Sequence, residues 1–360
     1  ANTSGLTITN VNSSGFQTGL YLNPGAEGTV VSDSSFIGTR AGAGVDSVQD
    51  LTLTNSTFDG NDLDLELFNI DGTQFVANDN TFVDGAIQNN QYGGQMSGVL
   101  SFGPSTFGGV QYDTLEIGSA NADMLTQSVG DDYIDGGAGV DTLTVAADID
   151  AADFTFNADG FMLAVDGDDT VLNVEKVVAN NQTYLIVGSG GFATIQDAVA
   201  AAADGQTIVV TEGNYSGTVT IGSGLNDVTI IGVGNVVLNG AFNIAGSGTT
   251  IDSLTIQNGA SITGSNTAIY LNAFDVTLSN LTMAKLTPPV PGLFVNGIES
   301  VFGSDTSGLT ITNVTSTGFN IGVYLNPGAE GAEITGSSFT GTYAGAGVDG
   351  VQDLTLTNNI

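Results

Sequence analysis

The amino-acid sequence predicts an all-β solenoid, in which short strands wind into the coils of a parallel β-helix. Three observations lead to this prediction. A long module repeats, because residues 1–57 match residues 304–360 at 40 of 57 positions without a gap. Within the module, apolar residues that alternate with Thr or Ser recur mostly every 22–23 residues. Glycine is abundant, at 52 of 360 residues, yet hydrophobic residues make up 41% of the chain, which is too many for a disordered protein.

A five-residue pattern of one strand and one turn defines the predicted coil. Residues 6–10 read Leu-Thr-Ile-Thr-Asn, and the alternation is typical of a strand with one face inward. The closing Asn tolerates the left-handed backbone of a sharp turn, so the Asn residues of successive coils are expected to form a ladder. Aromatic residues that recur at equivalent positions are expected to stack inside, and the alternative is a sugar-binding platform. They are Phe16, Tyr21 and Phe36 in one copy and Phe319, Tyr324 and Phe339 in the other. The further copies of the five-residue pattern lie at residues 51–55, 254–258, 276–280, 309–313 and 354–358.

One helix is predicted between these strands. Residues 194–197 form a capping box, residues 198–203 are strongly helical, and Gly205 is expected to be the C-cap. The helix, a strand at 207–210 and the Gly-Asn-Tyr at 213–215 together resemble the opening of pectin-lyase-like β-helices.

This resemblance covers about residues 186–360 and 1–115. It implies a right-handed parallel β-helix whose helix covers the first coil and protects its edge. The superfamily hosts lyases, hydrolases, tailspikes and adhesins, so the resemblance implies a fold and not an activity.

The strongest chemical motif lies at residues 119–145. Residues 136–143 fit the nonapeptide G-G-x-G-x-D-x-U-x, and two weaker copies precede it at nine-residue steps. The three copies place Asp123, Asp132 and Asp141 in register, and they resemble the calcium-binding repeats of RTX proteins.

The RTX resemblance implies a short β-roll in which two nonapeptides make one coil. Asp123 and Asp141 would then lie on the same side of adjacent coils, where their carboxylates and turn carbonyls would enclose Ca²⁺. The alternative is an ordinary Gly-Asp loop without a metal. The residues expected to bind Ca²⁺ are Asn121, Asp123, Gly130, Asp132, Gly137, Gly139 and Asp141.

The charge of the chain limits its partners. There are 38 acidic residues, 3 basic ones and no His, for a net charge of -35. Such a chain is repelled by nucleic acids and anionic membranes and attracts divalent cations, so neither nucleic-acid binding nor membrane insertion is expected. Alternation at Asp62, Asp64 and Glu66 predicts one outward row of carboxylates on a strand.

The sequence argues against an enzyme. Without Cys or His, thiol nucleophiles and histidine bases are absent, and no disulfide forms. The only arginine, Arg40, is replaced by Tyr343 in the second copy of the module, which argues against a role as a catalytic base. We therefore expect no catalytic residues and no organic cofactor.

The expected organisation has four parts, and the chain is expected to be a window from a longer tandem array. Residues 304–360 begin the module that residues 1–57 continue. The expected parts are the C-terminal coils of one β-helix unit at 1–115, the calcium-binding nonapeptides at 116–145, a small β linker segment at 146–187, and the helix cap and N-terminal coils of the next unit at 188–360.

The expected function is structural. The sequence favours a secreted or cell-surface protein that self-associates end to end or laterally into a calcium-stabilised fibre, surface layer or adhesin stalk, with glycans as possible ligands. The alternative is a carbohydrate-binding or polysaccharide-modifying β-helix, with its groove near the proline-rich loop at residues 288–291. A passive spacer that carries a distal binding domain is the third interpretation.

Overall fold

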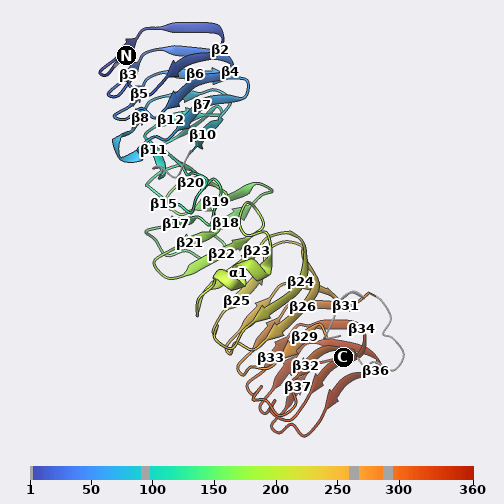
Figure 1. The fold of residues 1–360 in the computed structure, drawn as a ribbon. Helices are drawn as coiled ribbons and strands as arrows, with labels where there is room; N and C mark the ends of the chain where they lie inside the picture. The colour runs from blue at the N-terminus through green and yellow to red at the C-terminus, as the bar shows by residue number, and fades with distance from the viewer. Residues whose placement is uncertain (1–2, 91–97, 259–266, 287–294) are drawn as a thin grey trace. The chain divides into compact units, whose positions relative to one another are not determined.

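The computed structural model describes residues 3–90, 98–258, 267–286 and 295–360. They form an all-β, parallel β-solenoid of about 14 turns, in which one short α-helix is described (Figure 1). Contacts divide the chain into two compact units, unit 1 at Ala1–Asn181 and unit 2 at Gln182–Ile360. Within the described ranges, no helix has the length and apolar character needed to cross a membrane. The proline-rich loop at 288–291 lies outside the described residues.

Unit 1 begins with β-helix coils built from two sheets, in which the strands pair in parallel except for β12 and β13. The first sheet aligns Ile8, Val31 and Leu53 side by side, which confirms the predicted spacing of these coils. Its strands are β1 (Thr7–Thr9), β3 (Val30–Ser32), β5 (Thr52–Thr54) and β8 (Val76–Asn78). A short 3-10 helix, η1 (Gly72–Gln74), precedes β8. The strands of the second sheet are β2 (Asn12–Leu22), β4 (Ser35–Asp46), β6 (Thr57–Gly60), β7 (Leu63–Phe68), β9 (Thr81–Phe82), β10 (Ile87–Asn90), β12 (Ser105–Phe107) and β13 (Val110–Tyr112).

Stacked aromatic rings fill the interior of these coils. Phe36, Phe58 and Phe82 are fully buried on successive strands, with ring centroids 5.8 Å and 5.6 Å apart. The predicted aromatic interior is therefore confirmed at Phe36 but is wrong at Tyr21, which is 50% exposed. Phe16 is 63% exposed because β2 pairs only with β4, whereas its counterpart Phe319 is fully buried.

The nonapeptides continue unit 1 as a narrower pair of sheets. The first and third copies supply β15 and β17, which pair in parallel, and the second supplies β16 in the facing sheet. Residues from the 146–187 segment add β20 to β16 and β21 to β17. One sheet contains β11 (Leu100–Phe102), β14 (Thr114–Ile117), β16 (Asp132–Asp135), β20 (Asp168–Leu172), β19 (Gly160–Ala164) and β18 (Phe154–Phe156), and the facing strands are β15 (Met124–Thr126), β17 (Thr142–Thr144) and β21 (Lys176–Val178).

Unit 2 is a second stack of β-helix coils. In its first sheet Ile251, Leu278, Ile311 and Ile334 lie side by side. The strands of this sheet are β22 (Thr183–Val187), β23 (Thr207–Val210), β25 (Thr229–Gly232), β27 (Thr250–Asp252), β30 (Thr277–Ser279), β33 (Thr310–Thr312), β35 (Glu333–Thr335) and β37 (Thr355–Thr357). The facing sheet contains β24 (Gly213–Ile221), β26 (Val236–Ile244), β28 (Thr255–Asn258), β29 (Ile269–Leu271), β31 (Thr282–Lys285), β32 (Asn296–Ser300), β34 (Thr315–Leu325) and β36 (Ser338–Val348).

One copy of the strand-and-turn pattern lies in the facing sheet. The pattern at 254–258 forms β28, so Ile256 pairs with Leu238 and Met283 and not with Leu278. The expected equivalence of Ile256 and Leu278 is therefore wrong, because two strands of the same coil both alternate apolar and polar residues.

The helix α1 (Ile195–Ala201) packs against β22, β23 and β24 at the start of unit 2 (Figure 1). The predicted capping box is confirmed, since Thr194 Oγ1 accepts the Asp197 N–H at 3.1 Å. The predicted C-cap at Gly205 is wrong. The helix ends at Ala201, and Gly205, with φ +74°, turns the chain into β23 and donates its N–H to Asn226.

The predicted left-handed turns after the strands are confirmed at five of the six copies, whereas Asn258 of the sixth lies within β28. The Asn side chains also form the expected ladder in part, since Asn280 donates to Asp252 and accepts from Asn313, both at 2.8 Å. The turn residues with φ between +46° and +57° include Asn10, Asn55, Asn280, Asn313 and Asn358.

Candidate metal centre

The turns of the first and third nonapeptides stack directly on each other. Met124 pairs with Thr142, so Asp123 lies beside Asp141 in the neighbouring coil. The Asp123 N–H donates to Oδ1 of Asp141 at 2.6 Å, and Oδ2 of Asp123 accepts the N–H and hydroxyl of Ser119 at 2.6 Å and 2.8 Å. Asp123 is 7% exposed and Asp141 is fully buried. The two predicted ligands that lie 18 residues apart are thus brought together.

The stack continues into a residue that the motif did not mark. Lys176 pairs with Thr142, so Glu175 occupies the position of Asp141 one coil later, and its Oε2 accepts the Asp141 N–H at 2.7 Å. We call Asp123, Asp141 and Glu175 the carboxylate column. Glu175 lies outside the nonapeptides, so the sequence motif does not identify it. Only the parallel register of β17 and β21 shows that it belongs to the same column.

Asp132 lies on the opposite side, apart from the column. Both of its oxygens accept hydrogen bonds from Ser128, and its N–H donates to Oδ1 of Asp169 at 3.0 Å. Oδ2 of Asp169 accepts from Gln127 at 2.8 Å. Asp132 and Asp169 are buried, but all four of their carboxylate oxygens have partners.

The glycines of the motif allow these turns to approach closely. Gly137 has φ +87°, and a methyl group on it would lie 2.1 Å from the carbonyl oxygen of Ser119. Gly139 has φ +143°, and its methyl group would lie 2.7 Å from the carbonyl oxygen of Asn121. At Gly130, with φ +102°, a methyl group would instead meet the side-chain carboxylate of Asp113, which can move aside. Side chains at positions 137 and 139 would force the stacked turns apart.

Burial makes two carboxylates of the column, Asp141 and Glu175, hard to ionise. Desolvation raises the pKa of Asp141 to about 6 and that of Glu175 to about 7, and neighbouring carboxylates act in the same direction. Desolvation also raises the pKa of Asp169 to about 7. In the described part of the chain, the one ion pair joins Arg40 to Glu66 at 2.7 Å, away from the column. The column therefore requires protons or a bound cation to offset its charge.

Asp141, in the middle of the column, offers an oxygen that fits a calcium ion, whereas the three carboxylates of the column do not all lie within 4.8 Å of one another. Oδ2 of Asp141 is a buried carboxylate oxygen for which no hydrogen-bond partner is found. An orphaned buried carboxylate oxygen is costly unless a proton or a metal satisfies it. Carboxylates and main-chain carbonyls in glycine turns are the hard oxygen ligands that Ca²⁺ prefers. Asp123 and Asp141 would hold the ion, with Asn121, Gly137 and Gly139 shaping the turns.

A second group of carboxylates lies in the β-helix coils. Asp59, Asp64 and Asp84 place one oxygen each within 4.8 Å of one another. Asp64 is fully buried, and its carboxylate accepts the N–H groups of Asp84 and Ala86 at 3.0 Å and 3.1 Å. The predicted outward row is therefore not solvated at Asp64, which is buried by its hydrogen bonds to the main chain of the next coil.

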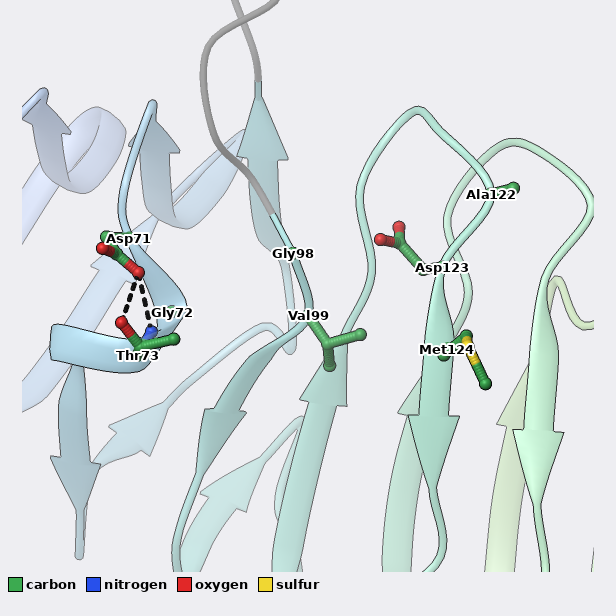
Figure 2. Close-up of a pocket in the computed structure, with 8 residues that line it drawn as sticks. All are labelled: Asp71, Gly72, Thr73, Gly98, Val99, Ala122, Asp123 and Met124. Atoms are coloured by element: carbon green, nitrogen blue, oxygen red, sulfur yellow. Dashed lines mark hydrogen bonds between the residues drawn. The ribbon is translucent and has the colours of Figure 1, made fainter.

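An open cavity of about 520 Å³ borders the column at Asp123. Figure 2 shows Asp123 and Met124 on one side of it, and Asp71, which accepts two hydrogen bonds from Thr73, on the other. Met124 is 77% exposed at this cavity, whereas Asp123 is 7% exposed.

Comparisons with known proteins assign no identity. The chain matches no model of a known protein family and no curated protein.

Proposed function

We propose that this protein is a structural repeat protein of the cell surface, which forms a calcium-stabilised fibre, surface layer or adhesin stalk. The observation that carries the proposal is the long internal repeat, in which residues 304–360 restate residues 1–57. Both copies fold into the same stacked coils, with the same register of β-strands. Coils that bond only to their neighbours make a stiff element that lengthens by repetition. Such repetition suits a scaffold better than a catalyst.

Calcium is the proposed cofactor of this protein, in which coils that resemble pectin-lyase-like β-helices are combined with nonapeptides that resemble RTX repeats. An ion at the carboxylate column would offset part of the net charge of -35 and satisfy the free oxygen of Asp141. Metal binding free energy then becomes folding free energy, so the protein would become rigid where calcium is plentiful, outside the cell. Self-association is the proposed partnership, end to end or side by side.

Electron microscopy of the purified protein tests this proposal. In millimolar calcium we expect regularly jointed filaments or arrays, which loosen after chelation. Short isolated rods that are indifferent to calcium would contradict the fibre and leave glycan binding to be assayed next.

A polysaccharide-active β-helix is the second candidate. Partial burial lowers the pKa of Lys285, which is the direction that favours a lysine base. In the sequence, Lys285 is followed by the proline-rich residues 288–291. Arg40 does not share this property, because its hydrogen bond to Glu66 raises its pKa. Release of unsaturated sugars from acidic polysaccharides, abolished by Lys285→Met but not by Arg40→Met, would favour this candidate over the fibre.

A further inference from the structure

We propose that residues beyond the nonapeptides complete the calcium site at Asp141. The additional ligands are the main-chain carbonyl of Asn173 and the carboxylate of Glu175. This inference rests on the calcium binding in the proposed function, and it names ligands that the repeat motif does not contain.

The free oxygen of Asp141 marks where the ion belongs. Asp141 is fully buried, and its Oδ1 already accepts the N–H of Asp123 at 2.6 Å. Oδ2 has no partner. Among the motif aspartates, Asp141 has the buried carboxylate oxygen without a hydrogen bond. A bound ion would therefore stabilise the fold most at this oxygen.

A second oxygen faces the same small space. A methyl group on Gly136 would lie 2.0 Å from the carbonyl oxygen of Asn173 and 2.8 Å from Oδ2 of Asp141. Both oxygens therefore point to one side of Gly136, which only a glycine leaves open. Calcium is bound by such mixed sets of carboxylate and carbonyl oxygens at about 2.3–2.6 Å.

The turn that carries Asn173 is fixed in place. Asn173 has φ +51°, and its Nδ2 donates to Oδ1 of Asp135 at 2.8 Å. The same Asp135 oxygen accepts the N–H of Gly137 at 3.0 Å. Asp135 thus joins the third nonapeptide turn to the Asn173 turn and holds the proposed ligands in register.

Glu175 supplies the second negative charge. It is 8% exposed, and its Oε2 lies 2.7 Å from the Asp141 nitrogen. The opposite side offers no comparable site, because hydrogen bonds from Asp132 and Gln127 satisfy both oxygens of Asp169. Asp141 in the column therefore has a carboxylate oxygen without a hydrogen bond, whereas Asp169 on the opposite side has none, and this difference can be tested.

Calcium titration calorimetry on the chelator-stripped 360-residue chain tests the assignment. Glu175→Gln keeps an oxygen that accepts the Asp141 N–H but removes the charge. We expect it to weaken one calcium site by about tenfold or more. Asp169→Asn is the matched control on the opposite side, and we expect less than about a twofold change because its oxygens bind no ion.

The outcomes separate this inference from the proposed function. A wild-type chain that binds no calcium would overturn both. Normal binding by the wild type and by Glu175→Gln would overturn the inference alone, as would equal weakening by Asp169→Asn.

Hydrogen exchange of the wild-type chain gives a test that needs no variant. Calcium is expected to slow amide exchange at residues 136–141 and 173–175 and to leave residues 166–169 unchanged. Calcium-dependent protection confined to residues 119–141 would overturn the role of Asn173 and Glu175.

Discussion

Single glycines set the separation of the stacked turns in the candidate metal centre. Gly137 combines a left-handed backbone with a close approach to the Ser119 carbonyl. Gly109 has nearly the same backbone, with φ +83°, but nothing lies within 4 Å of the position its methyl group would take. Alanine variants of Gly137 and Gly109 should therefore pay the same cost for the left-handed backbone, and only the Gly137 variant should also disturb the stacked turns.

Gly137→Ala is expected to destabilise unit 1 more than Gly109→Ala does. Both variants share the conformational cost of about 1 kcal/mol, and Gly137→Ala adds a clash that we expect to cost about 1–3 kcal/mol more. Urea unfolding of both variants in calcium measures the difference. An equal decrease in the free energy of unfolding of the two variants would show that the stacked turns can move apart without cost.

Stability without calcium is expected to fall as the pH rises. The pKa values of Asp141 and Glu175 are raised to about 6 and about 7, so the native state keeps these protons to higher pH than the unfolded chain does. The contribution is fully present below about pH 4 and is lost as the pH rises to about 7.

Calcium is expected to remove this dependence, because it replaces the protons. Urea unfolding at about pH 5 and about pH 7.5, in chelator and in calcium, measures it. A calcium effect that is no larger at the higher pH would contradict a role for these carboxylates.

At the scale of the element, the sequence predicted several strands and the start of the helix, but it misplaced one strand and the end of the helix. Alternation and the Asn turn predicted β1, β5 and β33 because each coil must bury one face. The same alternation misplaced β28, since both strands of a coil share it. The helix start was predictable from Thr194, whose hydroxyl caps it, but its end was not, because Gly205 serves the next turn instead.

The aromatic stack gives a test at the scale of the coil. Phe58→Ala removes the central ring between Phe36 and Phe82 and leaves a cavity, so we expect a loss of about 3–5 kcal/mol. Phe16→Ala, on a side chain that is 63% exposed, is expected to change stability by less than about 0.5 kcal/mol. Thermal unfolding of both variants compares them, and a small loss for Phe58→Ala would mean that the coils collapse around the gap.

At the scale of the whole molecule, the site belongs to one of two units. The carboxylate column lies in unit 1, whereas unit 2 contains β-helix coils and α1. A ligand that binds only the native state stabilises the unit that holds its site.

Calcium is therefore expected to protect unit 1 selectively. Hydrogen exchange should slow in the strands of unit 1 that adjoin the column, β15, β17 and β21, in proportion to the logarithm of calcium concentration, with unit 2 unchanged. The Asp141→Asn variant should lose this response. Equal protection of both units would place the dominant calcium sites elsewhere.

The sequence predicted the pairing of Asp123 with Asp141, because two nonapeptides make one coil and fix an 18-residue register. It did not predict Glu175, since the excursion through β18 and β19 separates it from Asp141 and hides the register. Neither did it predict the burial of Asp64, because a carboxylate can be placed inside when main-chain N–H groups of the next coil satisfy it.

The coil-by-coil pairing also has a genetic consequence. Within each unit, neighbouring coils pair strand to strand, and the two copies of the repeated stretch, which match at 40 of 57 positions, present the same strand register. Unequal crossing-over between the repeated stretches of the gene would therefore insert or delete a whole module in frame, and each strand of the product would still find a matching neighbour. A lineage that carries such a gene can change the length of the protein in a single recombination event, without the stepwise destabilisation that accompanies point mutation.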